Sequence, residues 1–354
     1  MRLFVTGAAG FIGSNFLYYY LWKYPESEII GYDKLTYAGN PENFFNLSED
    51  EKSRFTFIKG DICDPEKIAD IFKKYSVDCI VNFAAESHVD RSISDPQVFF
   101  KSNILGTGIL LDAAKKMWLK EGDWRENCKF LQISTDEVYG ALGPEGYFTE
   151  KSPLDPHSPY SASKAAADLM VKAYHDTYTM PVMITRCSNN YGPYQFPEKL
   201  IPLMIRNALK HLPLPLYGDG KQVRDWLYVK DHCRAIDNVV QKGNSGQVYN
   251  IGGNNELQNI DLVTLLLTIL QEETGDPEIN ETLIKFVKDR PGHDRRYAID
   301  SSKIQDELGW KPKTNFNEGI RRTIRWYLHN QDWMEHVISG EYMQFYENNY
   351  QNRT

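Results

Sequence analysis

The chain has 354 residues, enough for two domains or for one large α/β domain with an appended lobe. Its hydrophobic content of 42% and charged content of 25% are typical of a soluble globular protein. The net charge of −8 disfavours a nucleic-acid partner, because phosphate binding requires a basic surface. The apolar runs are far shorter than the ~20 residues that a membrane-spanning helix needs, so we expect no membrane partner.

The five cysteines are scattered along the chain, without a C-x-x-C pair and without a spacing to histidine that indicates a metal site. Such a set predicts reduced, mostly buried thiols. The N-terminus leads directly into an apolar run and lacks the features of a cleavable signal peptide. We therefore expect a cytoplasmic protein without a bound metal.

The first segment has the pattern of a dinucleotide-binding turn. Residues 2–6 predict a strand, Gly7, Gly10 and Gly13 form a G-x-x-G-x-x-G turn, and the residues up to about Trp22 predict a helix. Glycines let the backbone turn tightly and approach a pyrophosphate at the positive helix N-terminus. A second predicted strand, residues 28–32, ends at Asp33. A carboxylate there accepts hydrogen bonds from a ribose 2′-hydroxyl and repels a 2′-phosphate, which favours NAD over NADP.

Further strands are predicted at residues 55–59, 79–83, 130–133 and 181–186, and helical patterns separate them. One such helix runs from Pro96 to about Trp118, and another from Ser158 to about Tyr178. This alternation predicts an α/β fold with a Rossmann-like, doubly wound parallel sheet and a smaller C-terminal substrate-binding lobe. We expect residues 1–192, with some later segments returning, to bind NAD and residues 193–330 mainly to bind substrate. Residues 331–354 are expected to form a tail with an aromatic-rich helix.

A tyrosine and a lysine four residues apart, Tyr160 and Lys164, share one face of a predicted helix. The spacing alone is weak evidence, because Tyr19 and Lys23 repeat it on the first helix. Thr135 distinguishes the second pair, since it ends a buried strand at the same edge of the sheet. A tyrosine base needs its pKa lowered from about 10 toward 7, worth about 4 kcal/mol. A nearby ammonium and a nicotinamide cation favour the phenolate, so this set predicts oxidation of an alcohol.

Two adjacent carboxylates, Asp136 and Glu137, follow the same strand. Oxidation of a sugar at C4 acidifies the C5 proton, because the carbanion delocalises into the ketone. An acid–base pair then permits elimination: Glu137 takes the C5 proton, and protonated Asp136 releases the C6 hydroxyl as water. The pair therefore predicts a dehydratase rather than a simple dehydrogenase.

Several residues of the second half suit a nucleotide-linked substrate. Arg224, Arg290, Asn189 and Lys199 are candidates for binding a pyrophosphate. The run 214–217, Leu-Pro-Leu-Tyr, offers an apolar and aromatic slot for a nucleobase.

These motifs together resemble a known family. Residues 7–13, Asp33 and the Tyr160/Lys164 pair resemble the extended short-chain dehydrogenase/reductases that act on nucleotide sugars. Among these, Thr135-Asp136-Glu137 and the runs 190–194 and 290–297 are similar to the dTDP-glucose 4,6-dehydratases, and the similarity extends to about Tyr327.

The resemblance implies a tightly held, recycled NAD⁺, dTDP-glucose as substrate, and a product that feeds rhamnose and other deoxysugar pathways. It implies a homodimer through the helices after Pro96 and after Tyr160. It implies Thr135, Asp136, Glu137, Tyr160 and Lys164 as catalytic residues. With the glycines Gly7, Gly10 and Gly13, the residues implied for NAD are Phe11, Ile12, Asp33, Lys34, Leu35, Thr36, Asp61, Ile62, Ala84, Ala85, Ser87, Ser102, Tyr160, Lys164 and Asn190. The residues implied for the sugar nucleotide are Ser87, Thr135, Asn189, Lys199, Leu200, Pro215, Leu216, Tyr217, Arg224, Asn259, Arg290, His293, Asp294 and Tyr297.

Three alternatives remain at this stage. A nucleotide-sugar 4-epimerase would share the fold but would not need Asp136 and Glu137. A 4,6-dehydratase of a UDP-, GDP- or CDP-sugar would differ only in how it recognises the base. A non-catalytic NAD-dependent sensor would share the fold without turnover, which the intact catalytic set disfavours.

Overall fold

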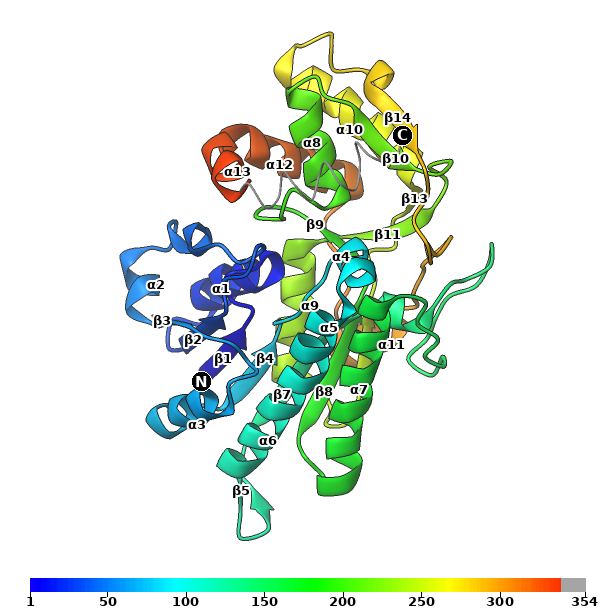
Figure 1. Cartoon of the computed structure of the whole chain (residues 1–354). Coiled ribbons are helices and arrows are strands. Elements are labelled where there is room, and N and C mark those ends of the chain that lie inside the picture. The colour runs from blue at the N-terminus through cyan, green and yellow to red at the C-terminus, as the bar shows by residue number, and fades with distance from the viewer. Residues whose placement is uncertain (339–354) are drawn as a thin grey trace.

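A seven-stranded parallel sheet forms the centre of the molecule, in the order β12-β8-β7-β4-β1-β2-β3 (Figure 1). The structure is a computed structural model and describes residues 1–338. The strands of the sheet are β1 (Arg2–Thr6), β2 (Glu28–Asp33), β3 (Phe55–Lys59), β4 (Cys79–Asn82), β7 (Lys129–Thr135), β8 (Val182–Cys187) and β12 (Val248–Ile251). The fold prediction is thereby confirmed, and every strand predicted from the first 192 residues lies in this sheet.

Helices cover both faces of the sheet. On one face α1 and α9 pack against each other and α11 packs beside α9, while α3, α6 and α7 form the layer on the other face. These helices are α1 (Phe11–Lys23), α3 (Pro65–Lys74), α6 (Thr107–Trp118), α7 (Pro159–Tyr178), α9 (Val229–Lys242) and α11 (Ser302–Leu308). Short elements connect them: η1 (Pro41–Phe44), α2 (Glu49–Ser53), α4 (Val89–Ser94), α5 (Pro96–Phe99), β5 (Leu119–Lys120), β6 (Asp123–Trp124) and η3 (Asp136–Tyr139).

The order in which successive strands extend the sheet reverses between β1 and β4. These two strands are neighbours in the sheet although two strands separate them in the chain. In open α/β sheets a crevice forms beyond the carboxyl ends of the strands at this point. Gly7 follows β1 and Phe83 follows β4, so the glycine turn lies at that crevice.

A second lobe lies above the carboxyl edge of the sheet in the view of Figure 1. It consists of β9 (Asn189–Tyr191), α8 (Leu200–Leu209), β10 (Leu214–Tyr217), β11 (Val223–Tyr228), β13 (Glu256–Gln258), α10 (Asn259–Thr274), η4 (Glu281–Leu283), β14 (Ile284–Val287), α12 (Phe316–His329) and α13 (Gln331–Val337). Its apolar core joins α8, α10, α12 and α13. Between β11 and α10 the chain returns to the sheet as α9 and β12, as expected for later segments. The boundary at residue 192 stays a prediction.

The helical stretch predicted from Pro96 to about Trp118 is present but not uniform. Its middle, η2 (Phe100–Gly106), is a π-helix between α5 and α6. Such widened turns occur frequently at functional sites. Here the turn includes Asn103, whose side-chain amide donates to the backbone oxygen of Glu86 (3.0 Å) and to Ser163 Oγ (2.8 Å).

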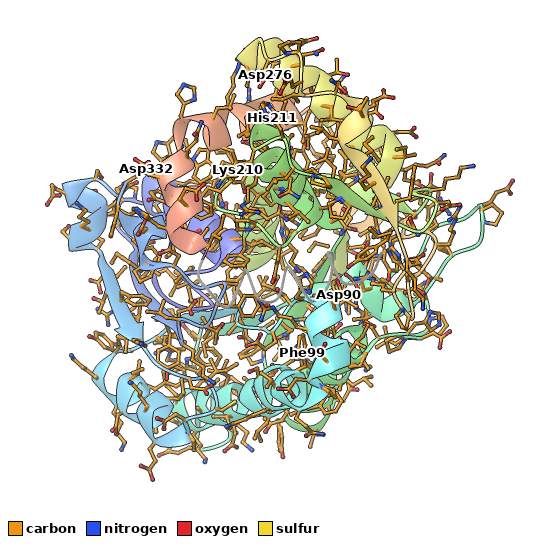
Figure 2. All side chains as sticks on the ribbon, turned by 45° about the horizontal axis from the view of Figure 1, so that its top comes forward. Asp90, Phe99, Lys210, His211, Asp276 and Asp332 are labelled. Atoms are coloured by element: carbon orange, nitrogen blue, oxygen red, sulfur yellow. The ribbon has the colours of Figure 1, made fainter. Side chains whose placement is uncertain are left out.

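In Figure 2, His211 and Asp276 lie together at the end of the second lobe, far from Phe99 of α5.

Part of the predicted terminal helix is present as α13, and Trp333 and Met334 are buried in the lobe's core. Residues 339–354 of the predicted tail lie outside the described residues. Within residues 1–338, no helix combines the length and apolarity needed to span a membrane.

Candidate active site

The glycine turn after β1 has the geometry of a pyrophosphate cradle. Gly7 adopts φ +64°, and a Cβ there would lie 2.7 Å from the backbone nitrogen of Ala84. A Cβ at Gly13 would lie 2.2 Å from the carbonyl oxygen of Gly7. Helix α1 begins directly after Gly10, and no side chain caps it. Its first N–H groups are therefore available to an anion, so the turn fits a dinucleotide pyrophosphate.

Asp33, at the end of β2, is fixed by its neighbours. Its Oδ2 accepts a hydrogen bond from the backbone N–H of Ala9 (3.0 Å), and its Oδ1 accepts one from that of Leu35 (2.8 Å). A carboxylate has further lone pairs, so these bonds orient Asp33 and leave capacity for ribose hydroxyls. The role of Asp33 toward NAD stays a prediction.

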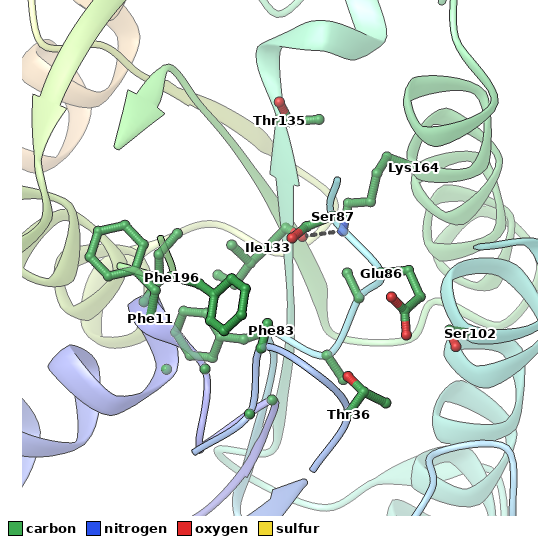
Figure 3. Close-up of a pocket in the computed structure, with 18 of the residues that line it drawn as sticks. Phe11, Thr36, Phe83, Glu86, Ser87, Ser102, Ile133, Thr135, Lys164 and Phe196 are labelled. Atoms are coloured by element: carbon green, nitrogen blue, oxygen red, sulfur yellow. Dashed lines mark hydrogen bonds between the residues drawn. The ribbon is translucent and has the colours of Figure 1, made fainter. Parts of the chain in front are cut away.

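One cavity of about 300 Å³ joins most of the predicted residues (Figure 3). All residues predicted to bind NAD line it except Leu35. The five catalytic candidates line it too, as do four substrate candidates, Ser87, Asn189, Lys199 and Thr135. The structure thus brings the carboxyl ends of β1, β2, β4, β7 and β8 to one site, which is the arrangement that the sequence predicted.

The two acids stand on a short, well-anchored turn. Thr135 ends β7, and its Oγ1 accepts the backbone N–H of Glu137 (3.3 Å), which caps η3. Tyr139 closes the same turn: its hydroxyl donates to Asn250 Oδ1 (2.8 Å) and accepts from Arg186 Nη1 (2.9 Å). Hydrogen bonds to β8 and β12 therefore hold the turn at the edge of the sheet.

Lys164 and Tyr160 lie on the first turns of α7, and both are buried. The Lys164 ammonium donates to the backbone oxygen of Ile133 at 2.7 Å, across from α7 to β7 (Figure 3). Phe99 packs edge-to-face on the Tyr160 ring, with a centroid distance of 6.3 Å. The pair predicted from its four-residue spacing is thus inside the cavity.

The electrostatics of Tyr160 differ from the expectation. Burial raises the pKa of Tyr160 well above 10, and the negative charge of Glu137 raises it further, while a hydrogen bond with Thr135 lowers it. Burial also lowers the pKa of Lys164. The protein alone therefore keeps Tyr160 as a phenol, and the positive charge that a phenolate needs has to come with the cofactor.

The environments of the two acids separate their roles. Burial, then Glu137 and Asp225, raise the pKa of Asp136 well above its ordinary value. Burial also raises the pKa of Glu137, but the positive charges of Arg290, Arg224 and Lys199 oppose this. Two carboxyls whose surroundings favour different protonation states are suited to act as an acid and a base. Asp136 is the better proton donor and Glu137 the better acceptor.

Three basic substrate candidates, Arg224, Arg290 and Lys199, exert their charge on the Glu137 carboxyl. Arg224 is buried, lies over the Tyr297 ring at 4.4 Å and donates to the backbone oxygen of Asp294 (2.9 Å). Tyr217 donates to Asp90 Oδ2 (3.3 Å), which Arg290 approaches at 3.9 Å. These contacts with α4 connect the second lobe to the sheet.

The predicted base slot is only partly accessible. Leu216 is 1% exposed and belongs, with Leu214, to the core of the second lobe, and Pro215 is also buried. Tyr217 is half-buried and stacks edge-on against His293, with a centroid distance of 5.9 Å. Leu200 begins α8, and Asn259 begins α10. Their contacts with substrate stay predictions.

Comparison with known proteins identifies the family. A protein from Xanthomonas campestris described as dTDP-glucose 4,6-dehydratase is 51% identical over 96% of both chains. Another, from Salmonella typhimurium, is 49% identical over the full length of both chains. The chain belongs to the dTDP-glucose 4,6-dehydratase family. The broader family described as GDP-mannose 4,6 dehydratase matches residues 4–323.

Solved structures of the dTDP-glucose 4,6-dehydratase family share this fold. The enzyme from Bacillus anthracis, crystallised with NAD, is 48% identical with a TM-score of 0.85, covering 95% of this chain and 99% of that one. The enzyme from Streptomyces venezuelae, also with NAD bound, is 47% identical with a TM-score of 0.86, covering 95% and 100%. A UDP-glucose 4-epimerase from Thermotoga maritima has the same fold at 27% identity, with a TM-score of 0.81 over 94% and 100%. The identities favour the dehydratases over the epimerases.

Sequence reasoning missed part of the dehydratase site. Glu198 is buried, lines the cavity, and accepts a hydrogen bond from Arg91 Nε at 3.1 Å. Arg91 lies 3.8 Å over the ring of Tyr37. Burial raises the pKa of Glu198. Tyr37 and Glu198 lie in loops and Arg91 lies on the short helix α4, so the acid in the run Pro-Glu-Lys at 197–199 was the one local signal available.

The repeated pair on α1 has a different environment. Tyr19 and Lys23 both donate to Asp237 Oδ2 of α9, at 3.0 and 2.5 Å, and Tyr24 donates to Oδ1 at 3.0 Å. Asp237 is fully buried. The same spacing thus gives a helix–helix contact here and a pair of cavity-lining side chains in α7.

Proposed function

We propose that this chain converts dTDP-glucose into dTDP-4-keto-6-deoxyglucose and water. The observation that carries the proposal is one cavity that contains Tyr160, Lys164, Asp136 and Glu137 beside the glycine turn. A dehydrogenase needs the first two of these residues, and an elimination needs an acid and a base in addition.

The residues divide the proposed reaction between them. When bound, NAD supplies the acceptor for the C4 hydride and the donor that returns it to C6. Tyr160 takes the proton of the C4 hydroxyl, and Thr135 shares that hydrogen bond. Glu137 takes the C5 proton, Asp136 donates its proton to the departing C6 hydroxyl, and Glu137 returns a proton to C5.

Positive charge around Glu137 supports a nucleotide diphosphate substrate. Arg224, Arg290 and Lys199 all act on the Glu137 carboxyl. Lys199 is oriented by a hydrogen bond to the backbone oxygen of Ser87 (2.7 Å). Guanidinium groups bind phosphate oxygens through parallel hydrogen bonds, so the two arginines suit a pyrophosphate.

Two exposed apolar side chains bear on assembly of the chain. Exposed apolar side chains at Leu105 (53%) and Leu169 (57%) lie on η2 and α7, which pack together. Their position supports a homodimer through these helices.

We also propose that the protein is cytoplasmic and that it acts in deoxysugar biosynthesis.

A panel of dTDP-, UDP-, GDP- and CDP-glucose tests the function. We expect the alkaline absorbance of a 4-ketosugar with dTDP-glucose, at a kcat/KM well above the other three. A comparable kcat/KM with another nucleotide-glucose would mean that this compound is a substrate as well. An epimerised sugar without a ketone would overturn the dehydratase proposal.

A further inference from the structure

The proposed reaction leaves a proton imbalance that the protein must correct. Tyr160 gains the proton of the C4 hydroxyl, while Asp136 loses a proton to the leaving water. Glu137 takes one proton from C5 and gives one back, so it ends unchanged. After each turnover, therefore, Tyr160 holds one proton too many and Asp136 one too few.

Bulk water has little access to either group. Asp136 is 1% exposed and Tyr160 is 8% exposed, and both face the cavity that the substrate fills. Thr135, at 8% exposure, lines the same cavity from the last position of β7, directly before Asp136. We propose that the Thr135 hydroxyl passes this proton from Tyr160 to Asp136 and so resets the site, an inference that rests on the proposed function.

The hydrogen bonds of Thr135 give the transfer a direction. A threonine hydroxyl has one proton to donate and two lone pairs to accept with. The backbone N–H of Glu137 occupies one lone pair (3.3 Å), and the hydroxyl proton points to Asp136 Oδ1 (3.2 Å). The interaction of Thr135 with Tyr160 lowers the pKa of Tyr160 and so favours the phenolate. Once Tyr160 is protonated, the second lone pair of Thr135 remains to accept from its phenol. The path therefore runs from Tyr160 through Thr135 to Asp136.

The other oxygen of Asp136 is left for the substrate. Asp136 Oδ2 is buried and has no hydrogen-bond partner among residues 1–338. One oxygen thus receives the proton from Thr135, and the other faces the cavity where the C6 hydroxyl departs. The two carboxyl oxygens connect the reset path to the elimination step.

The proton balance of the reset closes without another reactant. The O–H bond of Tyr160 breaks as a new O–H bond forms on Thr135, and the former Thr135 proton bonds to Asp136 Oδ1. No atom changes its oxidation state. The groups that face Asp136 are Glu137 of η3, Asp225 and Arg224 of β11, Cys187 of β8 and Tyr160 of α7. Two of these are carboxyls that favour the protonated acid. Because the phenol is the weaker acid in the protein alone, the transfer needs the same positive charge beside Tyr160 that the oxidation step needs.

The test compares the first turnover with later ones in the holoenzyme. Thr135→Val removes the hydroxyl and keeps the side-chain shape, and Thr135→Ser keeps the hydroxyl. Rapid quenching with dTDP-glucose measures 4-ketosugar per site, first with enzyme in excess and then with substrate in excess. We expect Thr135→Val to form about one ketone per site and then slow at least ~10-fold relative to its own first turnover. We expect the ratio of the two rates in Thr135→Ser to match that of the wild type.

Equal slowing of all turnovers would contradict the proposal. If Thr135→Val slows the first and later turnovers by the same factor, Thr135 acts only in oxidation and the reset path is wrong. A protein that makes no ketone even as wild type would instead overturn the proposed function.

A second readout does not depend on the stability of the valine variant. The carbonyl band of protonated Asp136, assigned by its loss in Asp136→Asn, is followed by infrared difference spectroscopy during turnover. We expect the wild type to recover this band within each cycle and Thr135→Val to accumulate ionised Asp136. Recovery of the band at the same rate in both proteins would contradict the proposal.

Discussion

His157 Nδ1 lies 2.6 Å from Asp294 Oδ1, so the residue before the N-cap of α7 is bonded to the loop of the second lobe that contains the proposed substrate residue Arg290. The other oxygen of Asp294 accepts from the Tyr297 hydroxyl at 2.5 Å. A Cβ at Gly292 would lie 2.9 Å from the carbonyl oxygen of His157, so the loop also packs on the backbone there. Helix α7, which carries Tyr160, and the loop that contains Arg290 are thereby connected.

We predict that His157→Ala weakens substrate binding more than catalysis. KM for dTDP-glucose should rise about 2- to 5-fold, the range for a partly exposed ion pair, while kcat changes less. Asp294 raises the pKa of His157 above its ordinary value near 6.5. The extra contribution of the protonated ring is therefore complete below about pH 6.5 and is lost as the pH rises through the raised pKa.

Steady-state kinetics between about pH 6 and 9, the interval in which a histidine with a raised pKa loses its charge, check this prediction. The control is His211→Ala. His211 Nε2 also lies close to a carboxylate, 2.7 Å from Asp276 Oδ2, but this pair is at the far end of the second lobe (Figure 2). Equal effects of the two variants on KM would contradict the role of the His157 contact.

We predict that Tyr160→Phe abolishes the redox step. Loss of a positioned acid–base group typically lowers the rate by about 10²–10⁴-fold, so the bound cofactor should remain oxidised after mixing with substrate. Cofactor absorbance in a stopped-flow instrument checks this. Tyr19→Phe is the matched control, since it removes the same hydroxyl from the same Tyr-x-x-x-Lys spacing. It should retain the rate and lower the free energy of unfolding by about 1 kcal/mol, through the lost bond to Asp237.

We predict a bell-shaped pH dependence of kcat when elimination limits the rate. Water loss needs Glu137 ionised and Asp136 protonated. Activity should fall as the pH drops through the Glu137 pKa, which is raised above 4.5, and as it rises through the raised pKa of Asp136. Arg290→Gln removes a charge that holds the Glu137 pKa down, so the acid limb should move to higher pH. An acid limb that stays in place or moves to lower pH would argue against Glu137 as the base.

We predict that Gly7→Ala prevents cofactor binding. The added Cβ would overlap the backbone of Ala84 and would require φ +64° from an alanine. The cofactor content of the purified protein, measured after denaturation, should drop to a small fraction of the wild-type value. Gly143→Ala is the control, because a Cβ there has no neighbour within 4 Å. Full cofactor content in Gly7→Ala would contradict the pyrophosphate role of this turn.

We predict that charge on the exposed apolar face of α7 dissociates the proposed dimer. Leu169→Glu would place a carboxylate inside that interface, and the molar mass from light scattering should then halve. Phe286→Glu is the control: Phe286 is 58% exposed, as Leu169 is at 57%, but it lies on β14 in the second lobe. A dimer that survives Leu169→Glu would place the interface elsewhere.

The elements of the sheet were predictable where local pattern and burial agree. β1, β2 and β3 coincide with apolar runs bounded by glycine, aspartate or lysine. The strand predicted at residues 130–133 is present as β7, which extends to Thr135. The last strand, β12, was not located, because Val248–Ile251 is four residues long and its partner β8 lies some 60 residues earlier. Only tertiary pairing identifies such a strand.

The candidate site was predictable as far as motifs at strand ends specify it. Tyr160, Lys164, Asp136 and Glu137 follow from spacing and context. Glu198 and Arg91 do not, because their pairing joins segments more than 100 residues apart. The pKa of Tyr160 was also beyond sequence reasoning, since the balance between burial and nearby charge depends on three-dimensional distances.

The late return of β12 to the sheet has a consequence for how the molecule can be divided. Without Val248–Ile251, the fully buried strand β8 would replace β12 as the sheet edge and expose its own unpaired N–H and C=O groups. Such edges pair with other chains, which leads to aggregation. The chain up to β8 is therefore not a separable module, because the chain has to pass through the second lobe before the sheet is complete on that side.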